Sequence, residues 1–242
     1  MNNRPLIVFD VNETLLDIEF LEPLFTDIFA VTGRMREWFA QVILYSETLS
    51  LAGPYVPFCK LGGGVLRMLG EIHGVAVTDD HVRKLGTLMT DMPVHADVAE
   101  GLSVLKDAGF SIVTLTNSPK SAGPDPLDRA GLGSLFDQRF TVDAVQRFKP
   151  TPATYQLVQE TMGSTPDATW LIAAHTWDTI GAQSFGWKGA LVTRGTNAPL
   201  VLDGVPQPTL VARDVAEAAR AIATGRSSTS QPTDAPAVFN SS

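Results

Sequence analysis

The feature that most constrains the fold of this chain is a series of short apolar runs, separated by segments with helical spacing. Five such runs lie at 5–10, 111–115, 140–142, 168–174 and 189–192, and the first of them reads PLIVFD. Continuous apolar runs of this length are typical of strands buried on both faces of a parallel sheet. The alternation therefore predicts an α/β fold, with a doubly wound parallel sheet and helices on both of its faces.

The alternation is interrupted between about Ile18 and Met89, where apolar residues recur at helical spacing with almost no strand pattern. We expect this part to form a helical insert after the first strand. The predicted division is a Rossmann-like core domain of residues 1–16 and 97–225 and a helical domain of residues 17–96. Residues 226–242 are rich in Ser, Thr and Pro and offer little to bury, which predicts a disordered tail.

The charge and composition of the chain disfavour several classes of partner. The formal net charge is -8, whereas nucleic acid or an anionic membrane requires a basic surface. The single cysteine, Cys59, excludes an internal disulfide and a thiolate metal cluster. No apolar run is long enough to span a bilayer, and residues 1–4 leave no room for a signal peptide before the first strand. We expect a soluble cytoplasmic protein without nucleic-acid or membrane partners; a few local cations would suffice for a small anionic substrate.

Polar residues follow four of the predicted strands. Asp10 ends the first, Thr116-Asn117-Ser118 the second, Lys149 comes shortly after the third, and His175 with Asp178 follows the fourth. Each alone is weak, because a strand-terminal Asp often caps a helix, Ser118 before Pro119 fits a turn, and most lysines are exposed. Ligands of open parallel sheets bind outside the carboxyl ends of the strands. Together, the four positions predict a functional site at this edge.

The order of these motifs resembles that of the haloacid dehalogenase superfamily over nearly the whole chain up to the tail. The matching runs are FDVNETL at 9–15, LTNS at 115–118, FKP at 148–150 with Tyr155, and AAHTWD at 173–178 with Gly181-Ala182. The helical insert corresponds to the cap domain of that superfamily. The Lys149-Pro150 run with Tyr155, and the run from Trp177 to Ala182, resemble the L-2-haloacid dehalogenases in particular.

Two positions argue against the magnesium-dependent phosphatases that make up most of the superfamily. A phosphatase needs a second Asp two residues after the nucleophile to protonate its leaving group, and that position is Asn12. Its magnesium needs carboxylate oxygens, but Ala173 and Ala174 stand where a Gly-Asp pair is expected. We therefore rank a phosphohydrolase below a dehalogenase and expect no metal or other cofactor. A non-catalytic binder of a small carboxylate is a third hypothesis, disfavoured because Asp10 and Lys149 are retained.

The resemblance implies a role for each residue of the site and a small 2-halogenated carboxylic acid as substrate. Asp10 is the nucleophile that forms an ester, Thr14 orients it, Lys149 neutralises it, and Asp178 positions Lys149. Ser118 and nearby backbone amides hold the substrate carboxylate. The other expected substrate-binding residues are Asn12, Asn117, Phe39, Tyr45, Phe58 and Trp177. The resemblance also implies a homodimer that associates through the cap.

Two departures from the usual dehalogenase pattern affect the predicted mechanism. Phe39 stands where the family has a halide-binding Arg. Arg34 or Arg36 could reach into the site instead, but we expect both to be solvated. His175 replaces the usual Asn, and Glu13 replaces a Gly. We predict that Glu13 hydrogen-bonds His175, which then takes a proton from the hydrolytic water, as in a subgroup of the family. The alternative is that His175 only makes hydrogen bonds at the end of the strand, while the Glu13 side chain is solvated.

Overall fold

The computed structural model of the chain describes residues 4–120, 123, 125–195 and 197–225. Its sheet has six strands in the order β3-β2-β1-β4-β5-β6, and every neighbouring pair is parallel. The strands are β1 (Leu6–Phe9), β2 (Ser111–Thr116), β3 (Gln138–Thr141), β4 (Thr169–Ala173), β5 (Lys188–Val192) and β6 (Leu210–Ala212). The predicted α/β class with a parallel sheet is confirmed.

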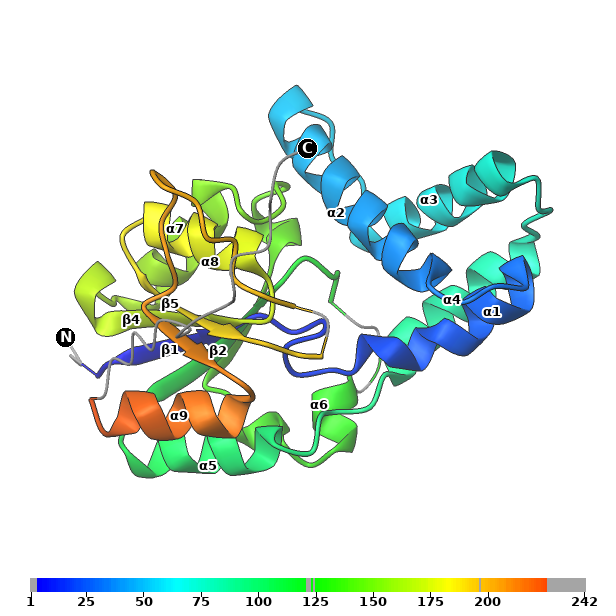
Figure 1. The fold of residues 1–242 in the computed structure, drawn as a ribbon. Coiled ribbons are helices and arrows are strands. Elements are labelled where there is room, and N and C mark those ends of the chain that lie inside the picture. The colour runs from blue at the N-terminus through cyan, green and yellow to red at the C-terminus, as the bar shows by residue number, and fades with distance from the viewer. Residues whose placement is uncertain (1–3, 121–122, 124, 196, 226–242) are drawn as a thin grey trace, which may run out of the picture.

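Helices cover both faces of the sheet, as Figure 1 shows. α5 (Val98–Asp107) and α9 (Val215–Ala223) lie side by side on one face, and α7 (Pro152–Met162) and α8 (Thr176–Ser184) lie on the other. Gly101 allows α5 and α9 to approach closely, since a Cβ there would lie 2.7 Å from Val215 Cγ1. The short elements are α6 (Pro126–Arg129) and the 3-10 helices Gly133–Leu135, Val142–Ala144 and Pro166–Ala168.

Two parts of the sheet differ from the prediction. The third strand spans Gln138–Thr141 rather than 140–142, because its first half carries polar residues at an edge of the sheet. The sequence pattern also missed β6 and α9. A strand of three residues is too short to produce a recognisable apolar run.

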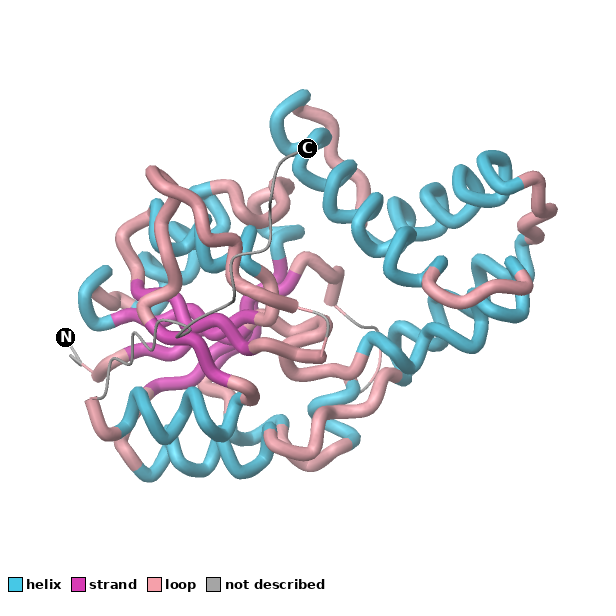
Figure 2. Tube along the Cα trace, in the orientation of Figure 1, coloured by secondary structure: helices cyan, strands magenta, loops and turns pink. Residues whose placement is uncertain are grey.

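The helical insert stands apart from the sheet in Figures 1 and 2. It contains the 3-10 helix Ile18–Leu21 and the helices α1 (Glu22–Phe29), α2 (Arg34–Ala52), α3 (Phe58–His73) and α4 (Asp79–Asp91). Its own core includes Trp38, which is fully buried and donates from Nε1 to the Gly62 carbonyl at 2.9 Å. We propose that residues 17–96 form a cap domain.

The chain enters and leaves the insert through two segments that pair with each other. Leu16 and Val94 form an antiparallel bridge. The Asp17 amide donates to the Pro93 carbonyl at 2.8 Å, and the His95 amide donates to the Leu15 carbonyl at 2.9 Å. The insert is therefore anchored beside the loop that follows β1.

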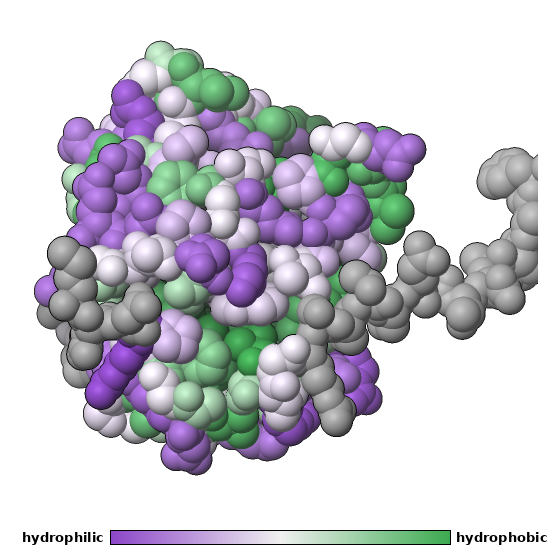
Figure 3. Space-filling model, turned by 90° about the vertical axis from the view of Figure 1, so that its left-hand side faces the viewer, coloured by the Kyte–Doolittle hydropathy of each residue, from purple (hydrophilic) through white to green (hydrophobic). Residues whose placement is uncertain are grey.

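The central strands form the core beneath the site. All four residues of β1 are at most 1% exposed, as expected of a strand covered on both faces. Figure 3 shows a surface on which hydrophilic and hydrophobic residues are mixed. Within the described residues, no helix is both long enough and apolar enough to cross a membrane. The predicted disordered tail, 226–242, lies outside the described residues.

Candidate active site

The loop after β1 fixes the position of Asp10. Asp10 directly follows the strand, is 4% exposed, and donates from its amide to the Ile172 carbonyl of β4 at 3.1 Å. Thr14 Oγ1 donates to Asp10 Oδ2 at 2.7 Å and accepts from the Ala174 amide at 2.8 Å. The hydroxyl of Thr14 therefore connects the Asp10 carboxylate to the end of β4.

Lys149 connects two buried carboxylates. Its Nζ lies 2.8 Å from Asp10 Oδ1 and 2.5 Å from Asp178 Oδ2, and its side chain is fully buried. The Tyr155 hydroxyl donates to Asp178 Oδ1 at 2.8 Å, so both oxygens of that carboxylate are held. Burial alone would lower the pKa of Lys149, but the two carboxylates raise it above its ordinary value. The ammonium is therefore charged at neutral pH.

Asp10 is held in its ionised form by its neighbours. Burial would raise the pKa of Asp10, but the charge of Lys149 and the hydrogen bond from His175 lower it well below the ordinary value. An ionised carboxylate is the form that can attack carbon. The site therefore provides a nucleophile without requiring a separate base to activate it.

The residues around Asp10 do not fit a magnesium site. Ala173 and Ala174 are fully buried and carry no side-chain oxygen, whereas Mg²⁺ prefers oxygen ligands. Within the described residues, no three His, Cys, Asp or Glu side chains converge into a set of metal ligands. The charge of Asp10 is balanced instead by Lys149 and His175.

His175 lies between two carboxylates. Its Nδ1 is 3.2 Å from Asp10 Oδ2, and its Nε2 is 2.9 Å from Glu13 Oε2. Ionised carboxylates only accept hydrogen bonds, so both ring nitrogens must carry a proton. Burial would lower the pKa of His175, but the hydrogen bonds with Asp10 and Glu13 raise it to about 9. His175 is thus an imidazolium while Asp10 is free, and the predicted Glu13–His175 hydrogen bond is present.

Glu13 is oriented by residues from two other parts of the chain. It is 2% exposed, and its φ of 66° lies in the left-handed region, which non-glycine residues seldom adopt. Its Oε1 accepts from Arg36 Nη1 of α2 and from Asn197 Nδ2 at 3.1 Å. Burial would raise the pKa of Glu13, but His175 and Arg36 lower it. The expectation that Arg36 is solvated is wrong, because the loop carrying Glu13 lies against the start of α2.

Ionic contacts join these side chains into a single row of alternating charge, which we call the charge row. In order, its members are Asp178, Lys149, Asp10, His175, Glu13, Arg36 and Glu19. The first six are three carboxylates and three cations, so their formal charges cancel. Only the end at Glu19 is substantially exposed, with 49% of its side chain accessible.

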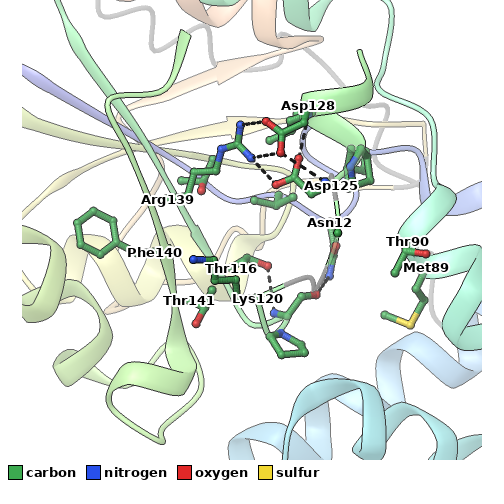
Figure 4. A pocket seen from close by; sticks show the side chains of 18 residues that line it. Asn12, Met89, Thr90, Thr116, Lys120, Asp125, Asp128, Arg139, Phe140 and Thr141 are labelled. Carbon is green, nitrogen blue, oxygen red and sulfur yellow. Dashed lines mark hydrogen bonds and ion pairs between the residues drawn. The ribbon is translucent and has the colours of Figure 1, made fainter. Parts of the chain in front are cut away.

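Three predicted substrate-binding residues lie at the ends of β1 and β2: Asn12 in the loop after β1, and Asn117 and Ser118 directly after β2. Asn12 Nδ2 donates to Ser118 Oγ at 3.0 Å, and Asn117 Oδ1 accepts from the Lys149 amide at 3.0 Å. Asn12 and Ser118 line a cavity of about 430 Å³, bounded opposite by Met89 and Thr90 at the end of α4 (Figure 4). This cleft gives a small solute access to Asn12 and Ser118 from the junction between the sheet and the insert.

Aromatic rings surround the other side of the site. The Phe39 ring centroid lies 5.5 Å from that of His175, and Trp177 stacks on His175 at 5.1 Å. Phe39, His175 and Trp177 line a second cavity of about 520 Å³, together with Glu13 and Arg36. Phe58 is buried against Phe148, the neighbour of Lys149, with ring centroids 6.0 Å apart, and it lines neither of the two cavities. This side of the site is largely apolar.

Tyr45 does not join this wall, contrary to the prediction. It is 37% exposed and lines neither of the two cavities. It lies six residues after Phe39 on the same helix, so its side chain is turned by about 240° from that of Phe39.

Three residues for which no role was expected hold the site together. Tyr155 was recognisable only by its fixed spacing from Lys149, and its contact with Asp178 explains that spacing. Arg36 and Asn197 carry no such signal, because each reaches Glu13 from a distant part of the chain.

This fold and site define a class of protein, and the comparison with protein families agrees. A family model described as haloacid dehalogenase-like hydrolase matches residues 5–186, which is more than half of the chain. The chain belongs to the haloacid dehalogenase-like hydrolase family.

Within that family, the chain is similar to enzymes named for one substrate class. The (S)-2-haloacid dehalogenase of Pseudomonas fluorescens is 28% identical over 219 residues, covering 90% of this chain and 96% of that protein. The L-2-haloacid dehalogenase structure from Xanthobacter autotrophicus has a TM-score of 0.79 at 25% identity, covering 92% of this chain and 99% of that one. A structure of that enzyme with chloropropionic acid covalently bound has a TM-score of 0.78 at 24% identity, covers 90% and 98%, and supports the fold alone.

Proposed function

We propose that this protein is an L-2-haloacid dehalogenase, which hydrolyses small 2-haloalkanoic acids to 2-hydroxy acids through an ester on Asp10. The observation that carries the proposal is the Lys149 ammonium, which lies between the carboxylates of Asp10 and Asp178. The cations beside Asp10, Lys149 and His175, are already paired with Asp178 and Glu13, so the site is better matched to a monoanionic substrate than to a phosphate dianion. The names of the similar enzymes support the same substrate class and the (S) enantiomer.

In the first half of the reaction, an Asp10 oxygen attacks C2 of the substrate in line with the carbon–halogen bond. The new carbon–oxygen bond forms as the halide departs with the bonding electron pair, so the leaving group needs no proton. The substrate carboxylate binds at Ser118, Asn12 and Asn117, beside the first cavity. The halide leaves toward the aromatic side, where the ring of Phe39 shelters a weakly hydrated anion.

In the second half, His175 and Glu13 activate the hydrolytic water. Forming the ester removes the negative charge that holds a proton on Nδ1 of His175. The imidazole then loses that proton and becomes a base beside the ester carbonyl, while Glu13 keeps the ring in place. Water adds to the Asp10 carbonyl carbon as His175 takes one of its protons. The bond from that carbon to the substrate oxygen then breaks, and the second water proton ends on the substrate oxygen as the new hydroxyl. The products are the Asp10 carboxylate and the 2-hydroxy acid.

Halide release tests the substrate class. The purified protein should release chloride from (S)-2-chloropropionate more rapidly than from the (R) enantiomer; fluoroacetate tests whether carbon–fluorine bonds are also cleaved. A phosphate monoester, with and without magnesium, is the matched substrate for the rival function. Magnesium-dependent phosphate release without halide release would contradict the proposal.

The His175→Ala variant tests the roles within the reaction. General-base catalysis contributes roughly 10²–10⁴-fold, so turnover should fall by about that factor while the ester accumulates as added protein mass. Glu13→Gln should have a smaller effect, because it removes the orienting charge and leaves the imidazole. If His175→Ala instead prevents ester formation, His175 acts in substrate or halide binding.

Size-exclusion chromatography with light scattering checks the homodimer that the resemblance predicts.

A further inference from the structure

Arg36 links the helical insert to the hydrogen-bonded pair of His175 and Glu13. Its guanidinium donates from Nη1 to Glu13 Oε1, and from Nε to Glu19 Oε1 at 2.8 Å. Glu13 is 2% exposed, whereas the Glu19 side chain is 49% exposed. An exposed ion pair contributes little to stability, but a buried carboxylate without a partner is costly. We therefore expect the contact with Glu13, rather than the contact with Glu19, to affect the reaction.

The two oxygens of Glu13 have separate partners. Oε2 faces His175 Nε2 at 2.9 Å, while Oε1 is held by Arg36 and Asn197. Two donors on one oxygen fix the rotation of the carboxylate, and this rotation directs the other oxygen at the imidazole. Without Arg36, only the uncharged amide of Asn197 would remain on Oε1. The carboxylate would then be free to turn, and the ring of His175 would lose its fixed orientation.

We propose that Arg36 is a positioning residue for ester hydrolysis: it orients Glu13, and through Glu13 the water-activating His175. The inference rests on the proposed function. Among the described residues, Arg36 forms ion pairs with Glu13 and Glu19 and none with Asp10, so we infer that it acts on the reaction through Glu13 and His175. Arg36 belongs to α2 of the insert. The contacts that orient Glu13 and His175 are therefore complete only when the insert is docked on the sheet domain. The alkylation step, which uses Asp10, Lys149 and Thr14, does not depend on this contact.

The test separates the two chemical steps in the full-length enzyme. (S)-2-chloropropionate is mixed rapidly with excess enzyme, and the reaction is stopped in acid at successive times. Chloride reports alkylation, and the added mass of the intact protein reports formation and decay of the ester. In Arg36→Met, alkylation should stay within about 3-fold of wild type, while ester decay should slow by roughly 10–100-fold, part of the whole contribution of a general base. Arg36→Lys should restore part of that loss, because it returns a donor and a charge.

Two matched variants control for the loss of a charged side chain from the same region. Arg34→Met removes a neighbouring arginine of α2 whose ion pair, with Glu37 at 2.6 Å, stays within the insert. Glu19→Gln removes the exposed partner of Arg36 and leaves the contact with Glu13. Both should leave the two steps at wild-type rates.

Three results would overturn or redirect the inference. Ester decay at the wild-type rate in Arg36→Met would show that Arg36 has no positioning role. An equal slowing of both steps with a raised KM, or slowing matched by Arg34→Met, would show that it only docks the insert. Absence of chloride release by the wild-type enzyme would instead refute the proposed function. Melting temperatures of all variants identify any that fail to fold.

Discussion

Replacing Asp10 with asparagine should lower the pKa of His175, because it removes one of the two carboxylates that keep the ring protonated. The substitution keeps the size and shape of the side chain and removes its charge, so it imitates the neutral ester. Glu13 remains on Nε2, and Lys149 remains paired with Asp178. The other charged group near the ring, Arg36, is bound to Glu13 and does not change.

The size of the shift follows from the contact that is lost. Hydrogen bonds to charged groups contribute about 1.5–3 kcal/mol, and one pKa unit corresponds to about 1.4 kcal/mol. The pKa of His175 should thus fall from about 9 by about one to two units, to a value near neutrality. The direction is fixed: losing an anion always disfavours the charged form of histidine.

Nuclear magnetic resonance of the histidine rings can measure the shift directly. The nitrogen chemical shifts of ¹⁵N-labelled imidazoles are followed against pH in the wild type and in Asp10→Asn, with His175→Gln used to assign the signal. His73 and His81 lie elsewhere and serve as internal controls. An unchanged pKa of His175, or a higher one, would refute the reasoning about how the site generates its base.

The pKa values of His175 and Asp10 also predict how ester hydrolysis and alkylation depend on pH. In the proposed mechanism, ester hydrolysis needs neutral His175, so its rate should rise with pH through the pKa of His175 in the ester state and then level off. Alkylation needs ionised Asp10, whose pKa lies well below the ordinary value, so it should be flat over the same range. The ester should therefore accumulate at lower pH, which intact-protein mass spectrometry can detect.

Three further predictions concern the metal, the nucleophile and the packing beneath the site. Chelator should leave halide release unchanged, because Ala174 supplies no ligand oxygen; loss of activity that magnesium restores would contradict this. One turnover in heavy-oxygen water should label the Asp10 carboxylate, read by peptide mass spectrometry, whereas label only in the hydroxy acid would indicate direct attack by water. Gly181→Ala should lower stability by about 1–3 kcal/mol and reduce activity, since a Cβ would lie 2.5 Å from the Tyr155 hydroxyl; an unchanged denaturation midpoint and turnover would count against this.

The local pattern of the sequence predicted the parts of the fold that local pattern controls. Buried strands such as β1 and β4 are continuous apolar runs, so their positions were recognisable within one or two residues. β6 was missed because its three residues carry too little pattern. Positions at strand ends indicated Asp10 and Lys149, since parallel strands bring their carboxyl ends to one edge.

The contacts that the sequence did not reveal are those set by packing between distant segments. Arg36 looked like a solvated residue of a polar helical stretch, and its contact with Glu13 depends on how the insert docks. Tyr45 of the insert was expected in the wall of the substrate pocket, but its position on α2 leaves it partly exposed. Docking angle and helix rotation depend on the whole set of packed side chains, and residue spacing alone does not determine them.

The charge row has a consequence for when the acid product of the reaction appears. Hydrolysis of a carbon–halogen bond yields one halide ion and one proton for each hydroxy acid. The first six members of the charge row are neutral as a set. Esterification of Asp10 leaves this row with one uncompensated positive charge in a buried environment. In the proposed mechanism, loss of the proton from His175 restores the neutrality of the charge row, and the water that attacks the ester later supplies its replacement. The proton is thus released with the halide, before the alcohol, and a pH indicator would register it as a burst within the first turnover.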